Sequence, residues 1–479
     1  MAPTTADPRA TAPEIPPSAD RAGRVEAHGI DYIPETERHG RARELFAVWA
    51  APNVSYLALV VGGALILMGL SFWQALAVIV IGNLFSILTG IVAASGPASG
   101  TPSEVVTRAI FGIRGNRVNI LVTSWFISIC YLALNWAAAS YTAFRLAERF
   151  GIEATTPVKV VLILAVAAIT LVIGVYGHAT IVRLYQPLAV VLTLVFVVMA
   201  GYVLGNADWG YRPEQSLHGI DLVATVAAGL AIVASAPLSY TNSADFARYL
   251  PRTTSPVSVG AWTALGAFVP SVLFTGLGAL AGTALDMADP QTALEAILPS
   301  WFTPVFLIAV IVGTIANNSM TAYSSGLALQ AIGLRLRRSR SVLLDGSIGI
   351  AMTMYALLVS NFLDTVSNMM QLVVTVMGPV MAVYVADVLW RRNRYDGLGL
   401  SNETASSPYW YTGGVNWAGT IAVFTGIAAS LLCVAAEVYT GPIARALGGV
   451  DLSLPVGLLL SAGLYLGLMS RYAAAEASR

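Results

Sequence analysis

The residues of this sequence best suited to binding chemistry lie in Ser235–Asp245, directly after the apolar run 222–234. Hydroxyls follow Pro237 in this stretch, among them those of Ser239 and Tyr240. Proline lacks a backbone N–H and crowds the preceding turn, so we expect a helix to break or kink here. Backbone groups freed in hydrocarbon must line a cavity or pack against protein. The stretch therefore predicts a ligand site at mid-membrane, and a kink without a ligand is the alternative.

A second polar group lies within the apolar stretch 303–333 and contains Asn317, Asn318 and Thr321. Side-chain amides within a membrane need hydrogen-bond partners, and such residues more often serve function than packing. We therefore expect these side chains to contribute to the same ligand site.

Several other kinds of chemistry lack the residues they need. The histidines do not cluster, and Cys130 and Cys433 lie in separate apolar runs without the spacing of a disulfide framework or metal site. No Gly-rich Lys motif for nucleotide binding is present, and a formal net charge of +0 gives no nucleic-acid signature. We expect no enzyme, no cofactor and no metal beyond a possible sodium ion, in a protein that works as a monomer.

Composition indicates an all-α integral membrane protein. Hydrophobic residues make up 56% of the 479 residues and charged residues 11%, which is enough apolar sequence for about a dozen spans. Residues 291–298 form a segment too short to span, which we expect at the surface. The twelve expected helices cover 45–70, 72–95, 117–148, 157–176, 181–204, 221–249, 257–284, 303–333, 342–359, 365–390, 415–438 and 452–471.

The ends and the loop charges predict an orientation. Residues 1–44 are rich in Pro, Ala, Glu and Arg without helical periodicity, which is typical of a disordered tail. Arginine-rich connections such as 335–340 and 391–394 fall on the same side as this tail. The positive-inside rule then places both termini in the cytoplasm of a multi-pass cell-membrane protein.

The first and sixth helices both contain a predicted break, at Pro52-Asn53 and at Pro237. Breaks at corresponding places in two halves indicate an inverted-repeat transporter whose site lies between them. The halves would be 45–204 and 221–390, and 391–479 would add two helices. Asn53 thereby becomes a candidate substrate ligand.

Motifs along the chain carry a family resemblance. They are Ile33-Pro34-Glu35-Thr36-Glu37-Arg38-His39-Gly40, Val48-Trp49-Ala50-Ala51-Pro52-Asn53, Phe111-Gly112-Ile113-Arg114-Gly115, Ala244-Asp245-Phe246-Ala247-Arg248-Tyr249-Leu250-Pro251, Tyr323-Ser324-Ser325-Gly326-Leu327, Val385-Ala386-Asp387 and Tyr409-Trp410-Tyr411-Thr412-Gly413-Gly414-Val415-Asn416-Trp417. Together they resemble the nucleobase:cation symporter-1 family, the purine–cytosine permeases. The resemblance implies a leucine-transporter fold with a five-plus-five inverted repeat and two extra helices. It also implies import of a nucleobase (purine or cytosine) or related flat heterocycle by proton or sodium symport with alternating access. A hydantoin, allantoin, vitamin heterocycle or amino acid is the alternative substrate.

Family members sandwich the heterocycle between aromatic rings and read its edge with amides. Tyr131 and Asn135 have the spacing of the family's third-helix pair, although an alignment without a gap from Phe111 would place Cys130 at the aromatic position. Tyr240 is the candidate for the second ring. Thr321 stands where many relatives carry the Asn that reads the substrate, which implies an altered substrate.

The resemblance leaves the coupling ion open. In sodium-dependent relatives, carbonyls of the first helix and hydroxyls of the eighth bind the ion. Ala51 and Val54 would supply the carbonyls here, with Thr314 and Asn317 nearby on the eighth helix. Asp245 is the candidate for proton coupling, and a helical pairing with Arg248 is the alternative interpretation.

Overall fold

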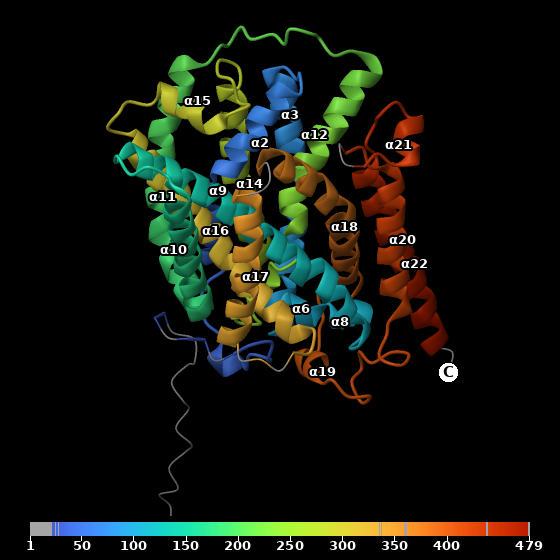
Figure 1. The fold of residues 1–479 in the computed structure, drawn as a ribbon. Coiled ribbons are helices and arrows are strands. Elements are labelled where there is room, and N and C mark those ends of the chain that lie inside the picture. Colours follow the sequence, from blue (N-terminus) through green and yellow to red (C-terminus); the bar gives the residue numbers. More distant parts are fainter. Residues whose placement is uncertain are drawn as a thin grey trace, which may run out of the picture.

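The computed structural model describes residues 22–477 apart from 24, 27, 335, 337, 359–361, 437 and 438, and for 338, 339, 362–372 and 475–477 it describes the backbone. Helices form a bundle whose two chain ends lie at the same face, here called the terminal face (Figure 1). The first elements are η1 (Glu35–Glu37), α1 (Glu44–Asn53), α2 (Tyr56–Leu67), α3 (Phe72–Asn83), α4 (Ser86–Ala93), α5 (Ser95–Ser99), α6 (Ser103–Val106), α7 (Arg108–Phe111), α8 (Gly115–Ile120), η2 (Leu121–Phe126), α9 (Ile127–Arg149), α10 (Thr156–Tyr176) and α11 (His178–Asn206). The remaining ones are α12 (Gly219–Ser239), α13 (Ala244–Ala247), α14 (Pro256–Ala281), α15 (Pro290–Ile297), α16 (Thr303–Ala331), α17 (Arg338–Leu358), α18 (Phe362–Trp390), α19 (Gly397–Ser401), α20 (Trp417–Cys433), α21 (Pro442–Ala446) and α22 (Ser453–Ala477).

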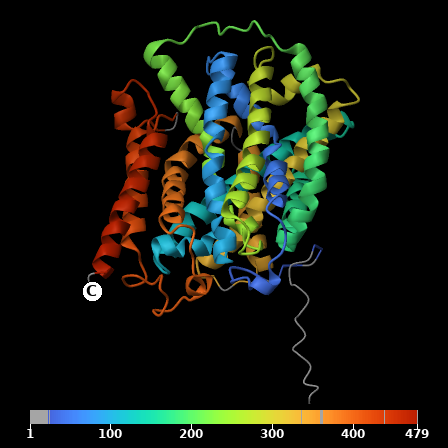
Figure 2. The ribbon, with the colours of Figure 1, turned by 180° about the vertical axis from the view of Figure 1, so that it is seen from behind.

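The expected membrane helices are present, with ends that agree to within a few residues. In the described part of the chain, ten helices are long and apolar enough to cross a membrane, and the bent pair α1–α2 makes eleven. The apolar α20 has 17 residues and lies outside that set, so the total of twelve stays a prediction. Seen from behind, α20 and α22 stand together at one edge of the bundle, where α22 packs on α18 (Figure 2).

The first break lies where the sequence predicts it. Pro52 is inside α1, which ends at Asn53, and α2 starts after Ser55 at an angle of 56° to α1. The Ser55 hydroxyl accepts a hydrogen bond from the Ala58 N–H at 3.3 Å, which caps the new helix. This span is therefore two short helices whose ends meet inside the bundle.

The second break lies slightly later than expected. α12 continues past Pro237 to Ser239, and the turn Tyr240–Ser243 separates it from α13. Because Pro237 has no N–H, the Val233 carbonyl loses its partner within the helix. The Pro237 carbonyl accepts from the Thr89 hydroxyl at 2.9 Å, which ties the break to α4.

The third span is not a uniform helix. The sequence predicts a continuous helix over 117–148, whereas η2 is a π-helical segment between α8 and α9. A π turn closes its hydrogen bonds over five residues and so holds one residue more than an α turn.

The prediction of a disordered tail over 1–44 is wrong for the described residues near its end. Ile33 is fully buried, and Arg38 and Glu26 are buried with it. The Arg38 guanidinium donates to the carbonyls of Ile33 and Pro97 at 2.9 and 2.8 Å. In the sequence these charged side chains suggest a solvated tail, but in the structure they bond to partners on the terminal face. Residues 1–21 lie outside the described part.

Candidate substrate site

A cavity lies between the two broken helices. Its volume is about 120 Å³, roughly the space that four waters take up in the liquid. It is lined by the α1–α2 junction, α3, η2, α9, the α12–α13 break, α14, α16 and α18. The predicted substrate residues that line it are Asn53, Tyr131, Asn135, Ser239, Tyr240, Asn317 and Thr321.

Aromatic rings stand at two places around this cavity. Trp49 and Tyr240 are in contact, with ring centroids 4.8 Å apart and planes tilted by 56°. Trp49 also meets the edge of Phe246, at 5.9 Å and 86°, which fixes its orientation. Tyr131 lines the cavity from α9, and Cys130 is not among the lining residues. The structure thus brings Tyr131, and not Cys130, to the site.

The Tyr131 hydroxyl is buried and has no hydrogen-bond partner within the described residues. Ser235 and Ser239 lie beside it, but their hydroxyls donate to the α12 carbonyls of Ile232 and Ala236, both at 2.7 Å. A buried donor without a partner is rare in a folded protein. Its place at the cavity wall suits a ligand atom or water that accepts its hydrogen bond.

Asn53 is in the cavity wall, but its side chain is already engaged. Its Oδ1 accepts from the Tyr240 hydroxyl at 3.1 Å and from the Ser271 hydroxyl at 2.8 Å, and its Nδ2 donates to the Trp49 carbonyl at 2.7 Å. This amide therefore joins the first break, the second break and α14. The hydrogen bond from the Tyr240 hydroxyl to Asn53 thus holds Tyr240 in position.

Three other side-chain amides at the cavity, unlike that of Asn53, are not engaged in hydrogen bonds with the described residues. The side chains of Asn135, Asn317 and Asn242 all line the cavity, and none of them makes a hydrogen bond within the described part of the chain. Thr321 donates to the backbone of Asn317 at 3.2 Å, which keeps its oxygen at the cavity wall. The unbonded amides are the groups that can read the edge of a polar ligand.

The prediction for Asn318 is wrong. Its side chain is fully buried between helices, and its Nδ2 donates to the Leu132 carbonyl of α9 at 2.9 Å. Neighbouring residues on a helix point about 100° apart, and here Asn317 lines the cavity while Asn318 faces α9.

The candidate cation ligands lie at the junction of the first break with α16. A Cβ on Gly313 would lie 3.0 Å from the Val54 carbonyl oxygen, so that carbonyl faces α16 next to Thr314. The Thr314 hydroxyl donates to Val310 at 2.8 Å, and Ala51 is buried. None of the three lines the cavity, whereas Asn317 does.

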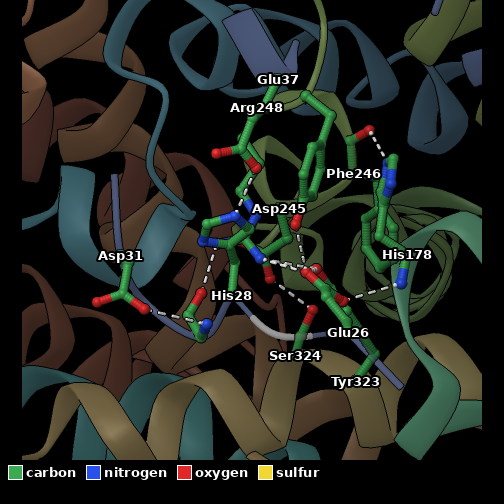
Figure 3. A network of polar contacts seen from close by, with 12 residues as sticks. Glu26, His28, Asp31, Glu37, His178, Asp245, Phe246, Arg248, Tyr323 and Ser324 are labelled. Carbon is green, nitrogen blue, oxygen red and sulfur yellow. Dashed lines mark hydrogen bonds and ion pairs between the residues drawn. The ribbon is translucent and has the colours of Figure 1, made fainter. Parts of the chain in front are cut away.

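Asp245 is fully buried on α13, and Arg248 pairs with Glu26 and not with Asp245 in the described residues, contrary to the alternative interpretation (Figure 3). Its carboxylate accepts from the Ser103 N–H at 2.8 Å and from the Ser324 hydroxyl at 2.5 Å. Arg248 donates instead to Glu26 at 2.8 Å and to the Gly29 carbonyl at 2.6 Å.

Comparison with known proteins decides the family. Residues 32–457 match the family described as permeases for cytosine/purines, uracil, thiamine and allantoin. The chain belongs to this permease family. The protein is accordingly a secondary transporter of nucleobase type.

Relatives and solved structures cover nearly the whole permease. A Bacillus subtilis (strain 168) protein named as a purine–cytosine permease is 28% identical, over 93% of this chain and 96% of its own. The allantoin permease of the same organism is 24% identical over 94% of each chain. The structure of Mhp1, a nucleobase-cation-symport-1 family transporter, closed with bromovinylhydantoin bound, has a TM-score of 0.77 at 18% identity and covers 93% of this chain and 96% of its own. This likeness confirms the predicted leucine-transporter fold.

Sequence reasoning missed Trp49 and Ser271 in this permease, whereas Asn242 lies in the predicted stretch 235–245 without having been singled out. Trp49 comes four residues before Asn53, one helical turn below the break, and that spacing could have indicated it. Ser271 carries no such signal, because its place depends on how α14 packs against the break.

Proposed function

We propose that this permease imports a flat nitrogen heterocycle of the nucleobase class, a purine or cytosine, by cation symport with alternating access. The observation that carries the proposal is the cavity at the two helix breaks, where aromatic rings accompany three amides that have no hydrogen-bond partner in the described part of the chain. A nucleobase has faces that stack on rings and an edge with both donors and acceptors.

In this proposal the ring of the substrate lies against Tyr131, with Trp49 and Tyr240 on the side of the breaks. Asn135 and Asn317 then meet its edge from α9 and α16. Each can donate and accept at once, so the pair can match a donor–acceptor edge such as that of cytosine.

The family supports symport with a proton or sodium ion, and the Val54 carbonyl facing Gly313 and Thr314 supports a sodium site there. We further propose that the protein works as a monomer in the cell membrane, with the terminal face in the cytoplasm. The arginines of the connections near that face support this orientation.

A heterocycle such as allantoin or a hydantoin is the second candidate, and the relative named as an allantoin permease supports it. Uptake by liposomes that contain the purified protein separates the two. Labelled cytosine, adenine, guanine, uracil, allantoin, hydantoin, thiamine and an amino acid would each be tested with an inward proton or sodium gradient and with none.

We expect saturable, gradient-dependent uptake of a purine or cytosine. Uptake of allantoin or hydantoin alone would establish the second candidate. If no compound in the series enters above the level of empty liposomes, the proposed substrate class is wrong.

A further inference from the structure

Two buried carboxyl groups meet where the connection after the second span contacts the second break. Glu104 on α6 is 1% exposed and Asp245 on α13 is 0% exposed. The Ser103 N–H donates to Asp245 Oδ1 at 2.8 Å, and the Ala244 N–H donates to the Ser103 hydroxyl at 3.1 Å. These bonds hold the first residues of α6 and α13 together and bring the Glu104 carboxyl against that of Asp245.

One oxygen of this pair lacks a donor. Asp245 Oδ2 accepts from Ser324 on α16 at 2.5 Å, and Glu104 Oε1 accepts from Ser124 at 3.2 Å. Glu104 Oε2 is buried, and no N–H or hydroxyl in the described residues bonds to it. A proton on Glu104 would supply the missing bond, because the protonated oxygen donates to the neighbouring carboxylate.

The nearby cations are engaged elsewhere. Arg248 pairs with Glu26 (Figure 3), and Arg108 pairs with Glu403 at 2.5 Å and donates to the Leu400 carbonyl. No ion pair in the described part of the chain reaches either carboxyl of the pair. The other titratable groups around it are Tyr384 on α18, whose hydroxyl lies 3.1 Å from that of Ser95, Tyr323 on α16, which bonds to Arg248, and Arg117 on α8, which pairs with Glu403.

Two adjacent buried carboxylates repel each other strongly, and such pairs titrate as a unit that shares one proton. Burial, together with the charge of Asp245, raises the pKa of the Glu104 carboxyl well above its usual range. Burial and the adjacent carboxylate thus both favour a proton shared by the pair.

A hydrogen bond also connects the pair to the wall of the substrate cavity. Ser124 in η2 lines the cavity and at the same time donates to Glu104. A ligand that changes the position of η2 thus changes the hydrogen bonding of Glu104. Asp245 is in turn tied through Ser324 to α16, whose next turns toward the cavity carry Asn317 and Thr321.

We propose that Glu104 and Asp245 form the proton-binding site of this permease. One shared proton joins α6 to α13 and α16 while the terminal face is closed. When the Glu104 O–H bond breaks and the proton passes to water at that face, two carboxylates remain, and their repulsion separates α6 from α13. This inference depends on the proposed symport and names its coupling ion.

The first test needs no substrate. Infrared spectra of the purified protein, recorded as the pH is raised, show the carbonyl stretch of protonated carboxylic acids and its loss. We expect Glu104→Gln to remove a band that Asp345→Asn retains. Asp345 is a matched control because it is also buried and accepts two hydrogen bonds, from Trp125 at 2.7 Å and Ser325 at 2.8 Å.

The second test measures heterocycle affinity against pH. The affinity of the unaltered protein should fall by up to about tenfold per pH unit above the pKa of the pair, since one proton binds with one substrate. Glu104→Gln should bind with an affinity independent of pH and should exchange substrate without accumulating it. Asp345→Asn should keep the pH dependence.

The proposal would be overturned if Glu104→Gln kept both the infrared band and the pH dependence. It would also be overturned if Asp345→Asn lost them and Glu104→Gln did not. Should Glu104→Gln not fold, Asp245→Asn tests the same loss of pH dependence, and Ser124→Ala should raise the pH at which the band disappears. A protein that binds no heterocycle contradicts the proposed function, while the infrared titration still decides whether the pair holds a proton.

Discussion

Asn135 and Asn318 are both side-chain amides within the helix bundle, but their surroundings differ. Asn135 lines the cavity without a hydrogen bond to the described protein, whereas Asn318 donates to the Leu132 carbonyl. A buried amide whose bond is already made stabilises the fold, and one without a partner is available to a ligand.

Replacement of these two residues should therefore have opposite effects. Asn135→Ala should weaken substrate binding by roughly five- to 150-fold, because a lost hydrogen bond to a buried partner costs about 1–3 kcal/mol. Asn318→Ala should bind nearly normally but unfold at a lower temperature. Calorimetric titration and thermal unfolding of both variants check this, and normal binding by Asn135→Ala would show that its amide does not read the substrate.

Tyr131 offers a ring to the site together with a hydroxyl that has no partner in the described protein. If stacking is its role, Tyr131→Phe should bind the substrate within a few-fold of the unaltered protein, and Tyr131→Ala should bind far more weakly. Equilibrium binding of both variants measures this. A large loss in Tyr131→Phe would instead mean that the hydroxyl bonds to the substrate.

At the scale of the element, Pro237 determines where α12 exposes its backbone. Without the Pro237 N–H the Val233 carbonyl has no partner in the helix, and Val233 lines the cavity. The proline thus leaves a carbonyl of α12 without its usual donor one turn before the second break.

Pro237→Ala restores that N–H and should straighten α12. We expect a decrease in transport of at least several-fold, with expression and thermal stability close to those of the unaltered protein. Liposome uptake and thermal unfolding provide the comparison, with Pro256→Ala as a control at the first turn of α14, where a proline replaces no helical bond. Undiminished uptake by Pro237→Ala would mean that the break serves packing alone.

At the scale of the whole molecule, the described residues of the segment 22–43 pack on the terminal face. Glu26 accepts from Arg248, Tyr249 and the His178 N–H, at 2.8, 2.7 and 3.0 Å, and both charges of the pair are fully buried (Figure 3). The segment thus joins the end of α13 to the start of α11 at this face.

Removal of one partner of a buried ion pair costs about 3–5 kcal/mol, so Glu26→Ala should loosen the terminal face. Hydrogen–deuterium exchange of residues 28–43 and of α13 should become at least tenfold faster. Glu37→Ala is the control, because Glu37 pairs with His28 at a partly exposed site, where pairs contribute about 0–1 kcal/mol. Equal exchange in both variants would contradict a role for Glu26 in closing this face.

Features that depend on a single stretch of the chain could be predicted from the sequence. Features that depend on contacts between residues far apart in the sequence were missed. Both breaks and the cavity between them follow from prolines within apolar runs. Glu104 and Glu26 went unnoticed because each looks like a residue of a solvated connection, and their partners Asp245 and Arg248 lie far along the chain. Asn318 was misassigned because an apolar helix that is buried on most sides does not reveal which face meets the ligand.

The π-helical segment η2 has a consequence for how this protein compares with its relatives. A π turn takes up one extra residue, so the residues after it keep the places that they would have in a regular α-helix one residue shorter. An alignment without a gap places Cys130 at the aromatic position, and the extra residue explains why Tyr131 occupies the cavity instead. Deletion of Val122 should therefore regularise the helix while Tyr131 stays at the cavity, and a substrate affinity close to that of the unaltered protein would confirm this; a maleimide reagent that reaches Cys130 from the cavity would contradict it.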